Sequence, residues 1–85
     1  MPTFLDYHAM PDLSPEATEG IAERIRAGEP DEFGAKALNV YLGKNGTAFC
    51  LSEAPKAEAV VNAHAAAGFP IAAEDVVEVE AVAAA

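Results

Sequence analysis

The dipeptide Asn45-Gly46 divides the middle of the chain and limits the folds that it can adopt. Asn-Gly between apolar runs is the strongest short-range hairpin signal, because both residues tolerate the positive φ that a type I′ turn requires. The runs on either side, residues 35–44 (AKALNVYLGK) and 47–53 (TAFCLSE), therefore predict two antiparallel strands joined by a two-residue turn.

A helix is predicted on each side of this hairpin. Ser14 can cap the first helix and Pro15 suits its first position, while Gly28 favours the helix end. Pro55 opens the second helix, which closes at Gly68.

The first and last strands of the chain are predicted at residues 3–9 (TFLDYHA) and 74–80 (EDVVEVE). The resulting order, β-α-β-β-α-β, predicts a ferredoxin-like α+β fold. Its four-stranded antiparallel sheet should have the order 4-1-3-2, with both helices on one face. We expect a single domain over residues 1–85, with a frayed tail from about residue 82.

Side chains alternate between the two faces of a strand, so each predicted strand can be sorted separately. We expect the helices to cover the more apolar face, which comprises Leu5, Tyr7, Leu38, Val40, Leu42, Phe49, Leu51, Val77 and Val79. The opposite face then carries Phe4, Asp6, His8, Asn39, Tyr41, Ala48, Cys50, Ser52, Glu78 and Glu80. The two-residue turn places Tyr41 opposite Cys50 and Asn39 opposite Ser52.

Side chains with metal-binding chemistry gather on this second face. His8, at the end of the first strand, meets the third strand near Cys50. The last strand brings Glu78 towards Asp6 and His8. Imidazole, thiolate and carboxylate together suit late first-row divalent metals such as nickel, copper and zinc. The predicted metal ligands are His8, Cys50, Asp6, Glu78 and, from the second helix, His64.

The same residues also have structural interpretations. Cys50 can be a small buried filler, and His64 can be a hydrogen-bonded core residue on the apolar stripe of its helix. Glu53 can stabilise the N-terminus of the second helix. The compact motifs HxxxH, HExxH and CxxC are absent from the sequence, so spacing alone leaves these alternatives open.

The acidic composition and the single thiol restrict the partners and the compartment. Fourteen acidic residues against five basic ones give a net charge of -9, so phosphate backbones are repelled and nucleic-acid binding is not expected. No apolar run approaches the ~20 residues that span a bilayer, so no membrane attachment is expected. The lone cysteine excludes an internal disulfide and fits a cytoplasmic protein.

An uncovered sheet face on so small a domain suggests a partner. Two copies stacked through their sheets would form a homodimer that encloses a cavity. Such a cavity also suits a small dimeric-barrel enzyme or small-ligand binder, although the sequence assigns no catalytic residue. Docking of the uncovered face on a larger protein, without metal, is a third interpretation.

Four segments resemble the small nickel-binding protein family that was long catalogued as a domain of unknown function. They are FLDYH (residues 4–8), AFCLSEAP (48–55), AEAVVNAHAAAG (57–68) and EDVVEVE (74–80). The resemblance implies a ferredoxin-like fold that dimerises through its sheet and binds nickel through histidine and other polar side chains. The matching positions are Asp6, His8, Cys50, Glu53 and His64.

Overall fold

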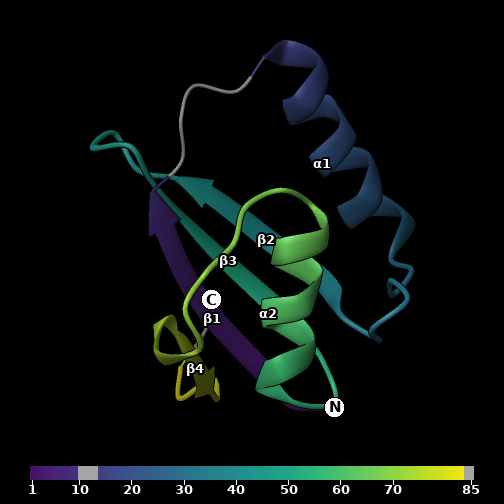
Figure 1. The fold of residues 1–85 in the computed structure, drawn as a ribbon, viewed down its shortest axis with the longest axis vertical. Helices are drawn as coiled ribbons and strands as arrows, with labels where there is room; N and C mark the ends of the chain where they lie inside the picture. Colours follow the sequence, from purple (N-terminus) through teal and green to yellow (C-terminus); the bar gives the residue numbers. More distant parts are fainter. Residues whose placement is uncertain (10–13, 84–85) are drawn as a thin grey trace.

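The computed structural model describes residues 1–9 and 14–83 of the chain. The elements occur in the predicted order (Figure 1). They are β1 (Thr3–Ala9), α1 (Pro15–Ala27), β2 (Lys36–Leu42), β3 (Thr47–Glu53), α2 (Ala57–Ala66), a short 3-10 helix η1 (Ala73–Asp75) and β4 (Val76–Val79). Part of the predicted frayed tail, residues 84–85, lies outside the described residues.

The sheet confirms the predicted topology. Its strands lie in the order β2-β3-β1-β4, which is 4-1-3-2 read from the other edge, and every neighbouring pair is antiparallel. Both helices lie on the same side of the sheet (Figure 1). There they line one cavity together with β2 and β3. The fold is therefore ferredoxin-like α+β.

The helix ends follow the sequence signals closely. The Ser14 hydroxyl accepts a hydrogen bond from the Ala17 N–H at 3.1 Å, which caps α1. Gly28 ends this helix with a φ of 67°, in the left-handed region that glycine tolerates best. Helix α2 starts two residues after Pro55 and ends two residues before Gly68.

The hairpin loop is one residue longer than predicted. The Gly43 N–H donates to the Thr47 carbonyl at 2.7 Å, and the Gly46 N–H donates to the Gly43 carbonyl at 3.0 Å. Gly46 has a φ of 83°, which is typical of a three-residue loop that ends in a left-handed glycine. The expected two-residue turn is therefore wrong, because Gly43 rather than Lys44 pairs with Thr47.

This extra loop residue changes the register between β2 and β3. The predicted pairs of Tyr41 with Cys50 and of Asn39 with Ser52 are wrong for this reason. A shift of one residue moves a side chain to the opposite face of the sheet. The observed pairs are Val40 with Cys50, Tyr41 with Phe49, Ala37 with Ser52 and Asn39 with Leu51, with a bulge between Ala37 and Asn39.

The helices cover the face of the sheet that carries Asp6 and Cys50, which was predicted to be uncovered. The side chains buried beneath them include Phe4, Asp6, Ala48, Cys50 and Ser52. On the other side, here named the open face, the exposed large apolar side chains are Leu5, Tyr7, Tyr41, Phe49 and Val77. The predicted assignment of faces is therefore inverted, although Val40 does line the cavity under the helices.

A small core explains why the helices select this face. The buried apolar cluster consists of Phe4, Ala35, Ala54, Ala59 and Val60. Helix α2 is rich in alanine, and small side chains on β3 let it approach the sheet closely. Helix α1 buries none of its residues within the described part of the chain, so it covers the sheet more loosely. No helix in residues 1–9 or 14–83 has the length and apolarity needed to cross a membrane.

Candidate metal centre

Asp6 lies on the central part of the sheet, on β1, and its side chain is completely buried with an exposed fraction of 0%. Among the described residues, neither carboxylate oxygen has a hydrogen-bond partner. Burying a carboxylate without hydrogen bonds costs free energy, because the group loses its water and gains no donor in return. A cation next to Asp6 would therefore offset the free-energy cost of burying its carboxylate.

His64 on α2 is the charged partner of this carboxylate. Its Nε2 lies 3.1 Å from Oδ1 of Asp6, at ion-pair distance but without the alignment of a hydrogen bond. Its Nδ1 lies 2.9 Å from the carbonyl oxygen of Val60, one helical turn earlier. A carbonyl oxygen only accepts, so Nδ1 carries a hydrogen and donates it to Val60. Nε2 therefore faces Asp6 either with a proton or with a lone pair that a metal can take.

The surroundings of His64 favour its protonated form. Burial has the largest single effect on the pKa of His64 and lowers it. The contacts with Asp6, Cys50 and the Val60 carbonyl act in the opposite direction and together raise the pKa from 6.5 to about 10. At neutral pH the metal-free protein thus holds an imidazolium against the buried carboxylate, and an entering metal cation would replace its proton.

Cys50 supplies a thiol from the neighbouring strand. It lies directly opposite Asp6 in the β1–β3 pair, and its side chain is 7% exposed. The thiol is not in a disulfide. Because Asp6 and Cys50 are paired across two central strands, the sheet itself holds their Cβ atoms roughly 5 Å apart.

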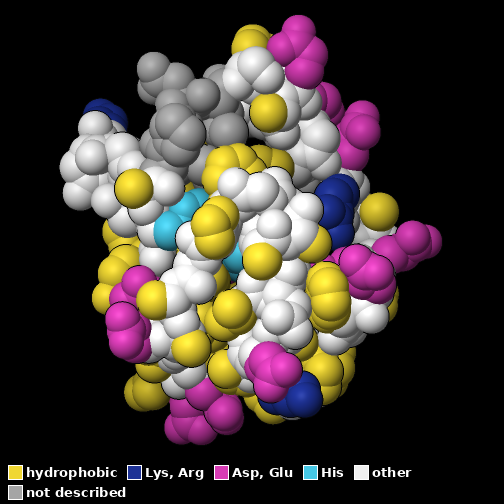
Figure 2. Space-filling model, viewed as in Figure 1, with side chains coloured by type: hydrophobic (Ala, Val, Ile, Leu, Met, Phe, Trp, Pro, Cys, Tyr) yellow, Lys and Arg dark blue, Asp and Glu magenta, His cyan; other side chains and the backbone are white. Residues whose placement is uncertain are grey.

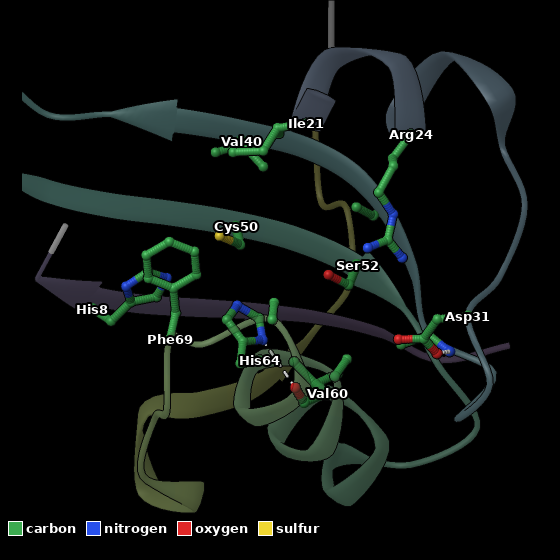
Figure 3. A pocket seen from close by; sticks show the side chains of 14 residues that line it. His8, Ile21, Arg24, Asp31, Val40, Cys50, Ser52, Val60, His64 and Phe69 are labelled. Atoms are coloured by element: carbon green, nitrogen blue, oxygen red, sulfur yellow. Dashed lines mark hydrogen bonds between the residues drawn. The ribbon is translucent and has the colours of Figure 1, made fainter. Parts of the chain in front are cut away.

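His8 lies two residues after Asp6 on the same face of β1. Its ring meets the ring of His64 edge to face, with centroids 5.3 Å apart, and stacks on Phe69 at 5.9 Å (Figure 3). Its Nδ1 lies 3.0 Å from the Ala9 carbonyl oxygen, so in the neutral ring Nε2 keeps the lone pair. Histidine side chains are visible at the surface on the helix side of the molecule (Figure 2), which gives the site a route to solvent.

These side chains form one compact set, the four-residue cluster of Asp6, His8, Cys50 and His64. One potential ligand atom from each residue lies within 4.8 Å of the others. Donor atoms bound to one ion at about 2.1–2.3 Å can be up to about 4.6 Å apart, so small side-chain movements would let all four reach it. Two imidazoles, a carboxylate and a thiol suit a late first-row divalent metal.

The structure brings together four of the five predicted ligands and separates Glu78 from them. Glu78 lies opposite Phe4 at the sheet edge, two residues before Asp6 along β1, and its side chain is exposed. The last strand thus places Glu78 on the same face as Asp6, but Glu78 is not among the side chains whose potential ligand atoms lie within 4.8 Å of one another. Glu53, which the family resemblance adds, pairs instead with Lys36 at 3.7 Å.

Sequence reasoning does not identify two supporting residues. Val60 precedes His64 by four positions, so helical periodicity alone could have indicated that its carbonyl is within reach of the imidazole. Phe69 follows the end of α2, and no pattern in the sequence indicates that its ring stacks on His8.

Comparisons with known proteins give two matches that span most of the chain. A family model described as "Nickel responsive protein SCO4226-like" matches residues 4–79. The crystal structure of SCO4226 from Streptomyces coelicolor A3(2) is similar with a TM-score of 0.70 and 30% sequence identity, over 95% of this chain and 99% of that one. A comparison with curated protein sequences gives no significant match.

Proposed function

Because the chain belongs to the SCO4226-like family of nickel-responsive proteins, we propose that it binds nickel(II) through the four-residue cluster. The family membership agrees with the resemblance of four sequence segments to a family of small nickel-binding proteins. The ligand assignment is argued from this chain's own side chains: imidazole suits nickel, and a carboxylate and a thiolate add the negative charge that a divalent cation favours.

The buried carboxylate of Asp6 is the observation that carries this proposal. In the metal-free protein its charge is balanced by the His64 imidazolium, which holds a proton where a metal would lie. A divalent cation would give Asp6 and Nε2 of His64 a shared partner, and its binding would release the imidazolium proton. His8 and Cys50 lie close enough to add two further donor atoms.

We expect His8→Ala to weaken nickel binding about tenfold, because one ligand at the accessible edge of the cluster is lost while the buried pair remains. Isothermal titration calorimetry of tag-free, metal-free protein with nickel measures the change. Glu78→Gln is the control, since it removes a carboxylate charge that lies outside the cluster. Unchanged binding by His8→Ala, or no nickel uptake by the wild type, would contradict the ligand assignment.

We also propose that the protein forms a homodimer through the open face of its sheet. Leu5, Tyr7 and Phe49 on this face are 37%, 47% and 38% exposed, which is a large apolar area for so small a domain. The face is nearly uncharged although the chain has a net charge of -9, because Glu53 at its margin is paired with Lys36. A second copy of the same face could therefore pack on it without bringing like charges together.

Phe49→Glu tests this dimer. A carboxylate in the middle of the open face would meet its own copy across the two-fold axis, so we expect dimerisation to weaken at least tenfold. Analytical ultracentrifugation over a range of concentrations gives the dissociation constants. Val82→Glu is the control, because Val82 is 92% exposed and lies beyond β4. A wild type that stays monomeric at high concentration, or equal weakening by both substitutions, would refute the dimer.

A further inference from the structure

A cavity of about 160 Å³ lies between α1, the sheet and α2, and the four-residue cluster contributes to one of its walls (Figure 3). His8, Cys50 and His64 line it on that side. The remaining wall is mainly apolar and includes Ile21, Ala37, Val40, Val60 and Ala63. An apolar cavity of about 150 Å³ in another protein holds one benzene molecule, so this volume matches a body of about six carbon atoms.

Arg24 places a positive charge at this cavity. Its side chain extends from α1 towards the cavity (Figure 3), and it has no ion-pair partner within residues 1–9 and 14–83. Arg26 on the same helix differs, because it pairs with Glu19 at 3.4 Å. A guanidinium that is left without an acidic partner beside an apolar cavity can bind a ligand carboxylate with two parallel hydrogen bonds.

The acidic residue that lines the cavity together with Arg24 is already engaged by backbone donors. Asp31 also lines the cavity, but its Oδ1 accepts hydrogen bonds from the backbone N–H groups of Phe33 at 2.9 Å and Ala35 at 3.0 Å. These bonds hold the carboxylate in the loop before β2. Backbone N–H groups thus already engage the Asp31 carboxylate, whereas the guanidinium of Arg24 keeps donors that a ligand carboxylate can accept from.

We propose that the cavity binds a small monocarboxylate with an apolar body of about six carbon atoms, whose carboxylate is held by Arg24. The apolar walls take up the body of the ligand, and the guanidinium selects its charge. This binding goes beyond metal binding and does not require a metal, because neither Arg24 nor the apolar walls belong to the four-residue cluster.

Benzoate is the probe that tests this proposal, in titration calorimetry and ligand-observed NMR with metal-free protein. We expect benzoate to bind at least tenfold more tightly than benzyl alcohol, which keeps the ring without the charge, and than acetate, which keeps the charge without the ring. Benzylamine should not bind. Equal binding of benzoate and benzyl alcohol, or stronger binding of benzylamine, would overturn the role of Arg24.

Two substitutions and one control distinguish the contribution of the arginine charge to benzoate binding from that of the cavity volume. Arg24→Gln should weaken benzoate binding at least tenfold, whereas Arg26→Gln on the same helix should leave it unchanged. Ala37→Leu should block benzoate by filling the cavity, without altering the arginine. Retention of benzoate by Arg24→Gln and by Ala37→Leu overturns the proposal. A nickel titration on the same wild-type sample distinguishes carboxylate binding from the proposed nickel binding. Nickel uptake without benzoate binding would contradict the carboxylate site and leave the proposed nickel site unaffected.

Discussion

Asp6→Asn is expected to lower the affinity for nickel by about a hundredfold, the largest loss for any single substitution in the four-residue cluster. The carboxylate is completely buried and has no hydrogen bond among the described residues, so a bound cation is the partner that would best compensate its charge. Removing one member of a buried charge pair costs about 3 kcal/mol or more, which corresponds to a factor of about one hundred in affinity. Calorimetric titration with nickel measures this loss.

The fold should survive this substitution. Asparagine has nearly the shape of aspartate, and its amide N–H can donate to Nε2 of the neutral His64 ring, which lies 3.1 Å from Oδ1 of Asp6 in the native protein. Circular dichroism checks that the metal-free variant is folded. Glu53→Gln is the matched control, because this residue is paired with Lys36 outside the cluster. If Asp6→Asn binds nickel like the wild type, the buried carboxylate is not a ligand.

The fold was largely predictable because the signals that determine it are local. Ser14 and Gly28 mark the ends of α1, and the Asn45-Gly46 dipeptide marks the hairpin, so the order of the elements and the sheet topology follow from short segments. The length of the hairpin loop did not follow, because Asn-Gly is compatible with both a two-residue and a three-residue loop. That one residue decides the register of β2, and no local signal sets it.

The covered face of the sheet could not be deduced from alternation. A period of two separates the faces but does not say which of them the helices cover. The larger apolar side chains, such as Leu5 and Phe49, suggested a core, yet they are exposed, whereas the small Ala48 and Cys50 lie beneath the helices. The prediction that metal ligands meet depended less on which face the helices cover. Asp6, His8 and Cys50 share one face of the sheet whether that face is covered or open.

The inversion of the faces also explains the position of His64. A cluster on the uncovered face could receive this histidine only from the rim, but beneath α2 it lies directly over Asp6, with its side chain 15% exposed. Glu78 stays outside, because the pairing of β4 sets it opposite Phe4. Long-range packing therefore decides which of the predicted ligands meet, and this information is not contained in any one segment.

The metal-free protein is expected to lose stability as the pH rises from neutral to alkaline. The pKa of His64 is raised from 6.5 to about 10 in the folded protein. A raised pKa stabilises the folded state fully below the unfolded value of 6.5, and this contribution disappears as the pH rises through about 10. The shift corresponds to a decrease in the free energy of unfolding on the order of 4 kcal/mol, and the melting temperature should fall by about 10 °C or more.

Urea unfolding of metal-free wild type and His64→Gln at several pH values between about 6.5 and about 10 measures this dependence. The two proteins differ only at residue 64, so the difference between the two pH profiles isolates the histidine. The variant keeps the buried Asp6 but lacks an imidazolium, so its stability should be lower at neutral pH and depend less on pH. Parallel profiles would mean that His64 is neutral in the folded protein, and the buried carboxylate would then need another source of positive charge.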